Sequence, residues 1–230
     1  MSVQVNSMNR GAVRSDLLMA GFDDAVQDAQ KVFRKVLKAM SEPGTILTAD
    51  LTNNTPGALN KSSWEIAQTL FDADTKIWLS PTLAGDDAVV SNLRFHCQCP
   101  MVSEPVEADF ALALADELPE LKALNWGNSE YPDQSTTLIV QVEAITNQVQ
   151  DSDEGWCLTG PGIETERGLS VKGLPYSFRL DLVNSRKRFP LGVDCVFCAD
   201  DQLVALPRST EIKPSDSEDG IRNTTQQEAN

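Results

Sequence analysis

The single histidine, His96, is the only side chain of the sequence whose ordinary pKa lies close to neutral pH. One histidine excludes any mechanism or metal site that needs two. Cys97 follows it directly, but we predict a strand here, and neighbours on a strand point to opposite faces. A nucleophilic pair of Cys97 and His96 is therefore disfavoured. We expect His96 to be packed or hydrogen-bonded within the fold.

Two cysteine pairs raise the question of a zinc site. Cys97 and Cys99 form the first pair, and Cys195 and Cys198 form the second, in a run typical of a strand. Residues three apart on a strand face opposite sides, so Cys195 and Cys198 could not share one tetrahedral metal ion. The alternative to zinc is that the cysteines are small buried hydrophobic residues. We expect the second case, and no metal.

Basic residues near the end of the chain are candidates for binding an anion or a partner. The cluster of residues 186–188 is either a solvated helix end that balances the helix dipole, or a contact for an anionic ligand through Arg188. Arg208, Ser209 and Thr210 follow the last predicted strand, and an arginine with two hydroxyls suits a phosphate. Capping of the strand end is the alternative.

A glycine-rich turn and one lysine could each bind a phosphate-containing group, but the sequence supports this only weakly. Gly160-Pro161-Gly162 could offer backbone donors to a phosphate, but the lysine of a full phosphate loop is absent, so we expect a tight turn. Lys172 is the least unsuitable lysine for a Schiff base with pyridoxal phosphate, although lysines at loop ends are usually solvated.

Composition narrows the class of protein. The chain has 230 residues, which fits one domain or two small ones. A formal net charge of −15 argues against non-specific binding to nucleic acid. No stretch approaches the length of a membrane-spanning helix, and the first residues lack the apolar core of a secretory signal. Five cysteines, an odd number, fit a reducing compartment. We expect a cytoplasmic protein.

The run from Phe22 to Ile46 predicts an amphipathic helix. Apolar residues recur in it at steps of three and four, namely Phe22, Val26, Ala29, Phe33, Leu37 and Met40. Acidic residues crowd its first turns and basic residues its second half, which complements the helix dipole. Pro43 and Gly44 predict where it ends.

That apolar stripe is expected to pack against a sheet. Loss of a large buried aromatic side chain costs about 3–5 kcal/mol, so Phe33→Ala is expected to destabilise the fold by that amount. Gln30 and Arg34, at the edge of the stripe, are candidates for contact with a ligand or partner.

The rest of the chain alternates between helix and strand patterns. We expect strands at residues 45–48, 76–79, 109–114, 136–142, 156–159, 192–199 and 202–206, and helices at about 62–71, 119–124 and 175–186. The last two strands should form a hairpin around Asp200 and Asp201. This alternation indicates an α/β fold, a sheet flanked by helices.

Domain boundaries follow from composition. Residues 1–20 look like a flexible leader, and residues 213–230 form a tail with few apolar residues that we expect to be disordered. Residues 21–212 then form a single α/β domain.

Six segments, in this order, resemble the H subunit of bacterial carbon–phosphorus lyase, the PhnH family: VQDAQKVFRKVLKAMSEPG, LRFHCQCP, STTLIVQV, LTGPGI, RFPLGVD and ALPRST. Each segment alone is weak, but the ordered set is specific. The resemblance covers roughly residues 21–212.

The resemblance implies a fold, partners and a function. Such subunits form a homodimer and join G, I and J subunits in a cytoplasmic core complex for phosphonate degradation. That complex helps to transfer the ribose triphosphate of ATP to a phosphonate, releasing adenine. The H subunit has a three-layer fold similar to that of pyridoxal-phosphate-dependent transferases. It lacks the cofactor lysine and has no known catalytic residues, so no cofactor is expected.

Two functions are therefore in competition. The first is an accessory, non-catalytic subunit of a phosphonate-processing complex. The second is a stand-alone binder or enzyme for a phosphorylated small molecule, acting through Arg188, Arg208, Ser209 and Thr210.

Overall fold

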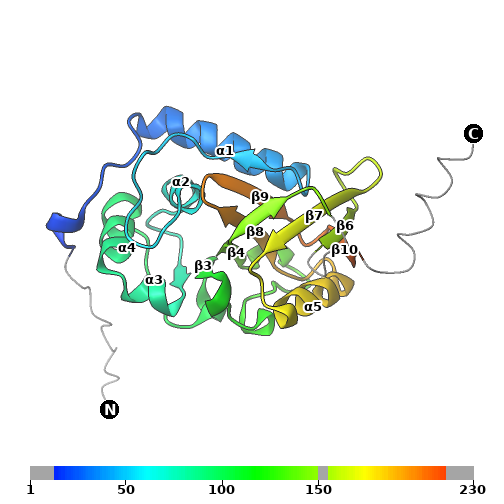
Figure 1. The fold of residues 1–230 in the computed structure, drawn as a ribbon. Helices are drawn as coiled ribbons and strands as arrows, with labels where there is room; N and C mark the ends of the chain where they lie inside the picture. The colour runs from blue at the N-terminus through cyan, green and yellow to red at the C-terminus, as the bar shows by residue number, and fades with distance from the viewer. Residues whose placement is uncertain (1–12, 150–154, 216–230) are drawn as a thin grey trace, which may run out of the picture.

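A computed structural model describes residues 13–149 and 155–215 (Figure 1). These residues form two β-sheets and the helices that cover them. The mixed α/β fold predicted from the sequence is confirmed. Most of the expected leader, residues 1–12, and most of the expected tail, residues 216–230, lie outside the described residues.

The larger sheet has six strands in the order β1-β9-β8-β4-β3-β2. Its strands are β1 (Leu47–Thr48), β2 (Ile77–Leu79), β3 (Phe110–Leu114), β4 (Thr137–Gln141), β8 (Asp194–Ala199) and β9 (Gln202–Leu206). β2, β3, β4 and β8 run parallel, and β9 is antiparallel to both of its neighbours. The β8–β9 hairpin was predicted, and Asp200 makes its turn with a positive φ of 48°.

A smaller antiparallel sheet was not predicted. Its order is β10-β6-β7-β5, with β5 (Ala144–Thr146), β6 (Gly155–Thr159), β7 (Arg167–Lys172) and β10 (Glu211–Pro214). Only β6 was expected from the sequence. β10 pairs with β6 and includes Lys213 and Pro214, which the sequence places in the tail.

Alternation along the central strands divides the interior into two cores. On β4, Ile139 belongs to one hydrophobic core, and Leu138 and Val140 belong to the other. All three are fully buried. A central strand that is apolar on both faces must be covered on both faces, which explains its continuous apolar sequence.

Helices cover one face of the large sheet, and the small sheet covers the other. The first layer contains α1 (Ala25–Ser41), α2 (Lys61–Leu70), α3 (Pro81–Gly85) and α4 (Asp87–Asn92). The layer on the opposite face contains the small sheet and α5 (Tyr176–Ser185). The domain thus has three layers, but only one outer layer is helical, because the other outer layer consists largely of the small sheet (Figure 1).

Short helical segments make most of the remaining connections. A π-helix, η2 (Leu93–Cys97), follows α4 directly. The 3-10 helices are η1 (Ser15–Leu17), η3 (Pro105–Glu107), η4 (Ala115–Glu117), η5 (Leu121–Ala123), η6 (Pro132–Gln134) and η7 (Arg186–Arg188).

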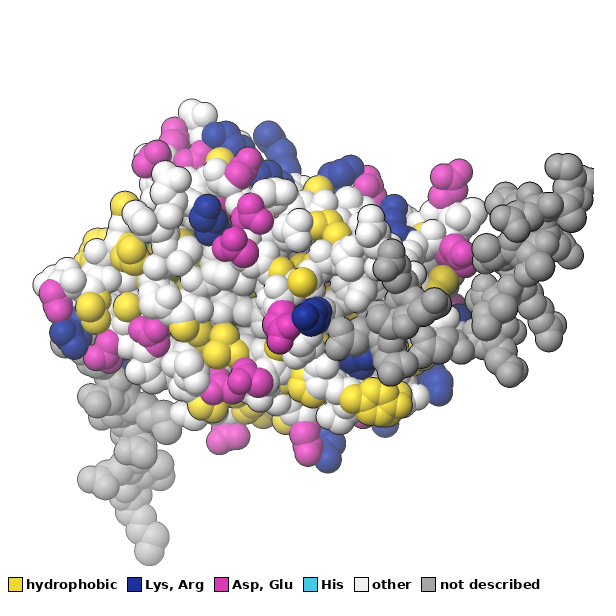
Figure 2. Space-filling view, viewed as in Figure 1, with side chains coloured by type: hydrophobic (Ala, Val, Ile, Leu, Met, Phe, Trp, Pro, Cys, Tyr) yellow, Lys and Arg dark blue, Asp and Glu magenta, His cyan; other side chains and the backbone are white. Residues whose placement is uncertain are grey.

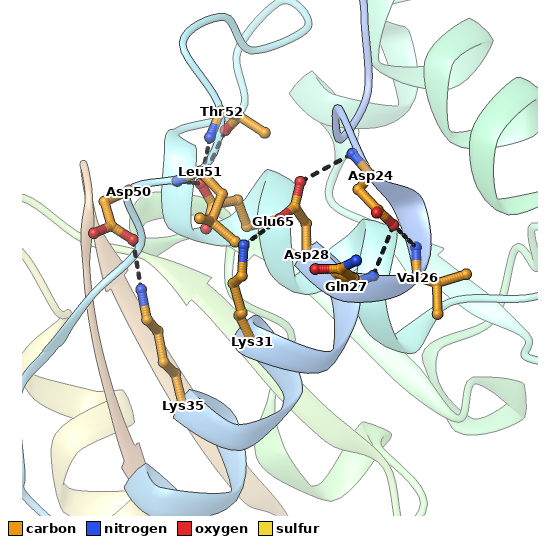
Figure 3. Close-up of polar contacts among 10 residues, drawn as sticks. All are labelled: Asp24, Val26, Gln27, Asp28, Lys31, Lys35, Asp50, Leu51, Thr52 and Glu65. Carbon is orange, nitrogen blue, oxygen red and sulfur yellow. Dashed lines mark hydrogen bonds and ion pairs between the residues drawn. The ribbon is translucent and has the colours of Figure 1, made fainter.

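Helix α1 begins and ends where its capping residues predict. The side chain of Asp24 accepts hydrogen bonds from the backbone N–H groups of Val26 and Gln27 (Figure 3). At the other end Gly44 has φ +78°, a left-handed conformation that glycine adopts without strain. The predicted stop at Pro43-Gly44 is confirmed.

The predicted inward face of α1 is wrong for Val26, Phe33 and Leu37, although Phe22 and Met40 of the predicted stripe pack against the core. Val32 and Ala39 are fully buried and Val36 is nearly so, whereas Val26, Phe33 and Leu37 are 69%, 45% and 51% exposed. The helix carries apolar residues on two faces, and the face with the smaller side chains packs on α2 and β9. Small side chains let the helix axis approach its neighbours closely, so side-chain size alone did not identify the inner face.

Glu65 of α2 fixes the loop that follows β1, beside α1. This buried carboxylate accepts hydrogen bonds through Oε1 from the backbone N–H groups of Leu51 and Thr52, at 2.7 and 2.8 Å (Figure 3). The helix itself is capped by Asn60, whose side chain accepts a hydrogen bond from the Ser63 N–H.

Candidate functional site

The carboxyl edge of the parallel strands, where α/β sheets commonly bind ligands, is filled by a polar network. At the end of β4, the Gln141 Oε1 accepts hydrogen bonds from the Asn60 N–H at 2.6 Å and the Ser63 hydroxyl at 2.5 Å. Its Nε2 donates to the Ala58 carbonyl at 2.9 Å. Asn60 in turn donates to the Cys198 carbonyl. The amino end of α2 is thereby fastened directly onto the sheet edge.

Arg208, one of the predicted anion-binding residues, lies near the opposite edge, where β8 begins. Its guanidinium donates to the Pro132 carbonyl and the Ser135 hydroxyl, and it lies 3.6 Å from the Asp194 carboxylate. The Asp194 carboxylate also accepts the Arg208 backbone N–H at 2.7 Å. These partners all belong to the fold, and they join the start of β8 to the segment before β4.

Ser209 and Thr210 make the turn between β9 and β10. The Thr210 N–H donates to the Pro207 carbonyl, and the Thr210 side chain is 1% exposed. A residue buried to this degree does not present its hydroxyl to a ligand in solution. Arg208 and Thr210 therefore face inward, although the phosphate-binding alternative uses both.

The basic cluster of residues 186–188 divides into one half-buried and two exposed residues. Arg186 donates to the carbonyls of Val193 and Leu206, and its burial lowers the pKa of its guanidinium. Lys187 bonds Asn184 on the surface. The exposed Arg188 stacks over the Trp126 ring, with 5.2 Å between the guanidinium carbon and the ring centroid.

Arg34 lies on the outer surface of α1 and is exposed. Among residues 13–149 and 155–215 its side chain forms no hydrogen bond or ion pair. The structure thus separates Arg34, on the helical layer, from Arg188, in η7, and from Arg208, which follows β9. The five predicted residues do not form one site.

The glycines of Gly160-Pro161-Gly162 allow a tight turn to pack against the end of α1. Gly162 has φ +81°, and a Cβ there would collide with the Ser41 carbonyl. Arg167, on β7, completes this junction by donating to the carbonyls of Glu42 and Pro43 at 3.0 and 2.6 Å. The turn therefore serves the packing of the small sheet on α1.

His96 is held within the fold, as predicted, but the predicted strand is wrong because residues 93–97 form a π-helix. The His96 Nε2 donates to the Met19 carbonyl at 2.9 Å, and its ring meets the Trp64 ring edge-on at 5.5 Å. With Asn92, which bonds both Met19 N–H and the Leu17 carbonyl, it fastens the residues before α1 to the domain.

The cysteines of the first pair are buried, and burial raises the thiol pKa of both. For Cys99 the value reaches about 11. Cys97 contacts the Ala67 carbonyl through its sulfur, away from the hydrogen bond of His96. Thiols that stay protonated at neutral pH are poor nucleophiles.

The second pair behaves as predicted. Cys195 belongs to the core under the small sheet, and Cys198 belongs to the core under the helices, so their sulfurs face opposite sides of β8. Burial raises both thiol pKa values to about 12. In the described part of the chain, no three His, Cys, Asp or Glu side chains come together in a way that could hold a metal ion.

Comparison with known proteins gives the family. A family model described as bacterial phosphonate metabolism protein (PhnH) matches residues 20–213. The chain belongs to the PhnH family. The six ordered segments therefore identified the family correctly.

Two relatives extend this PhnH assignment over most of the chain. The alpha-D-ribose 1-methylphosphonate 5-triphosphate synthase subunit PhnH of Rhizobium meliloti is 34% identical over 202 residues, which are 87% of this chain and 98% of the relative. The protein HtxG of Stutzerimonas stutzeri, provisionally named a C-P lyase subunit, is 30% identical over 188 residues, 80% of this chain and 85% of the relative.

Several residues that organise the structure of this PhnH protein are hard to recognise in its sequence. Arg167 and Gln141 are single polar residues in otherwise ordinary strand sequences. Asn60 has the spacing of a helix cap to Ser63, which could have been recognised.

Within the described residues no helix is both long and apolar enough to cross a membrane.

Proposed function

We propose that this chain is the PhnH component of a bacterial complex that makes alpha-D-ribose 1-methylphosphonate 5-triphosphate during phosphonate degradation. The observation that carries the proposal is the 34% identity to a protein with that name over 98% of its length. A match of that extent leaves no large part of the relative without a counterpart in this chain.

In this proposal the chain is an accessory subunit without catalytic activity of its own. The side chains that could carry chemistry have structural partners: His96 holds Met19, Arg208 holds Asp194, and four of the five cysteines are buried in the two cores. The catalytic step of the complex then belongs to other subunits.

We further propose a cytoplasmic homodimer that assembles with G, I and J subunits. Arg34 and Arg188 are the predicted residues that remain exposed, and arginine is enriched at protein interfaces. Arg188 and Trp126 form a cation–aromatic pair, and arginine and tryptophan are enriched among the residues that contribute strongly to binding. We assign these two arginines to contacts with partners.

The similarity of the fold to pyridoxal-phosphate-dependent transferases is part of the proposal, without the cofactor. A mixed sheet covered by helices on one face supports it. The Lys172 Nζ lies 3.5 Å from the Glu143 Oε2, and both side chains are exposed to solvent. A lysine in such a position is not enclosed in a pocket that could hold a cofactor as a Schiff base. Incubation with pyridoxal phosphate and borohydride should leave no adduct on Lys172 beyond that on other surface lysines.

Co-expression tests the proposed assembly. The chain, carrying an affinity tag, is produced together with G, I and J subunits from the same organism. The mass of the purified complex is then measured by native mass spectrometry. We expect the four proteins to co-purify in fixed ratios. Recovery of the chain alone, with the other subunits soluble in the flow-through, would contradict the proposal.

A matched pair of variants tests the role of Arg188. Arg188→Ala removes the guanidinium from Trp126, whereas Lys187→Ala removes a neighbouring exposed cation that only bonds Asn184. Recovery of the partners should fall with Arg188→Ala and stay unchanged with Lys187→Ala. Equal recovery with both variants would remove Arg188 from the proposed contacts.

A further inference from the structure

Arg179 on the inner side of α5 is a buried cation without a counter-charge. The residue is only 8% exposed. Its guanidinium carbon lies 5.7 Å from the centroid of the Trp156 ring, and Trp156 is itself 1% exposed. Within residues 13–149 and 155–215 this guanidinium forms no hydrogen bond and no ion pair, and its Nε is fully buried. Because burying an unpaired charge is costly, such a side chain points to an anionic group that binds it.

Other arginines that the fold covers are satisfied by groups of the chain. Arg167, Arg186 and Arg208 each donate to backbone carbonyls. Asp181 is the one acidic residue of α5, and residues two positions apart do not face each other on a helix. Arg179 is therefore left with its aromatic contact alone, which attracts a cation but does not replace a counter-charge.

The amino end of α5 adds positive potential in the same turn. The helix has 10 residues, its cap residue Pro175 offers no side-chain acceptor, and its first turn contains no acidic residue. The Arg179 N–H donates to the Pro175 carbonyl at 3.1 Å and closes this turn. In the described part of the chain, the N–H groups of residues 176–178 donate to no acceptor. A helix end of this kind carries partial positive charge and is suited to bind an anion.

The guanidinium and the helix end face the same place, and that place is open to solvent. A helical side chain leans toward the amino end of its helix and covers the preceding turn, which for Arg179 is the first turn of α5. Tyr176 and Ser177 in this turn are exposed, whereas Phe178 is buried and anchors the helix to the core. Figure 2 shows Lys and Arg side chains gathered around the lower right of the molecule, where α5 lies, although the chain has a net charge of −15.

We propose that the amino end of α5 and the guanidinium of Arg179 together bind an oxyanion of the phosphate or phosphonate class. A guanidinium can bond two oxygens of such a group as a fork, and the free N–H groups of the helix can bond a further oxygen. A tetrahedral group has enough oxygens for both sets of donors. The Trp156 ring supports the guanidinium. This site binds without catalysing, so it is compatible with the proposed accessory function and does not depend on it.

Isothermal titration calorimetry of the isolated full chain with inorganic phosphate tests the site, at an ionic strength kept constant with chloride. We expect one phosphate per chain. Arg179→Met should raise the dissociation constant at least about tenfold, because it removes charge-assisted hydrogen bonds to the anion. Lys187→Met is the matched control, because it removes an exposed cation just beyond the other end of α5, and it should leave the constant unchanged. A separate titration with methylphosphonate shows which of the two anions the site prefers.

Thermal unfolding gives an independent readout. In phosphate-free buffer, Arg179→Met should melt at the same temperature as the wild type or higher, because it removes an unpaired buried charge. Phosphate at ten times its dissociation constant should raise the melting temperature of the wild type by about 3–6 °C and leave that of Arg179→Met unchanged. Ser177→Asp places a carboxylate at the helix end, so it should stabilise the phosphate-free protein and reduce the phosphate shift.

Three results would overturn the inference. The first is that neither phosphate nor methylphosphonate binds to the wild type. The second is equal affinity of the wild type and Arg179→Met for phosphate. The third is a lower melting temperature of Arg179→Met in phosphate-free buffer, which would mean that the guanidinium has its partner within the chain. All three are measured on the isolated chain, so they are distinct from failure of the proposed function, which is loss of co-purification with G, I and J subunits.

Discussion

The neighbouring residues Val32 and Phe33 on α1 give the sharpest prediction for stability. Val32 is fully buried, whereas Phe33 is 45% exposed. Val32→Ala should therefore lower the free energy of unfolding more than Phe33→Ala does, although valine is the smaller side chain.

The magnitudes follow from burial. Val32→Ala removes two buried methyl groups at about 0.8 kcal/mol each and leaves a small cavity, so we expect a cost of about 2 kcal/mol. Complete burial of a phenylalanine side chain is worth about 1.5–3 kcal/mol, and Phe33 is only half buried and leaves no enclosed cavity. Phe33→Ala should cost about 1 kcal/mol or less.

Urea unfolding of the isolated protein measures both costs. With a slope of about 2 kcal/mol/M, Val32→Ala should lower the midpoint by about 1 M and Phe33→Ala by about 0.5 M or less. The protein is kept dilute, at concentrations where the midpoint no longer depends on concentration, because dimerisation would stabilise the wild type. A cost of 3–5 kcal/mol for Phe33→Ala, as the sequence alone suggested, would refute the orientation of α1.

Three other predictions concern single contacts. Arg167→Met should lower the free energy of unfolding in urea by about 2–3 kcal/mol, because it leaves the carbonyls of Glu42 and Pro43 without their donor. Lys172→Met, the control, removes only an exposed ion pair and should change this free energy by less than about 0.5 kcal/mol. Equal effects of the two substitutions would contradict the role of Arg167. Thiol titration of the native protein at pH 8 should modify Cys157 before the other four cysteines, which are buried and should react only after unfolding, because the reagent cannot reach them in the fold. Modification of Cys99 or Cys195 in the native protein as early as Cys157 would contradict this burial. The hydrogen bond to Lys31 lowers the pKa of Asp28 below its value in the unfolded chain, so this contact stabilises the fold above about pH 4 and is lost as the pH falls through the lowered pKa. The stability difference between wild type and Asp28→Asn should accordingly shrink under acid, and a constant difference would refute the contribution of the ion pair.

Much of the α/β framework could be predicted because local sequence determines it. The β8–β9 hairpin was recognised from two strand-like runs around Asp200 and Asp201, and the end of α1 from Pro43 and Gly44. The small sheet was missed because β5 and β10 are short and β7 is partly polar. These strands are stabilised by pairing between segments that are distant in sequence.

The orientation of α1 shows a second limit. Its sequence has two apolar faces, and periodicity identifies a helix without telling which face a distant sheet will cover. The arginines show a third limit. Arg188 and Arg208 look equally available in the sequence, but Asp194, Pro132 and Ser135 enclose only Arg208, and the fold brings these partners together from separate segments.

Synthesis of alpha-D-ribose 1-methylphosphonate 5-triphosphate by the reconstituted complex is the decisive measurement for the proposed function. The remaining subunits of the synthase are incubated with ATP and methylphosphonate, with and without this chain, and the product is measured by mass spectrometry. We expect product only when this chain is present and none from this chain alone. Equal product formation in its absence, or product from the isolated chain, would contradict the proposal that it is an accessory subunit of this complex.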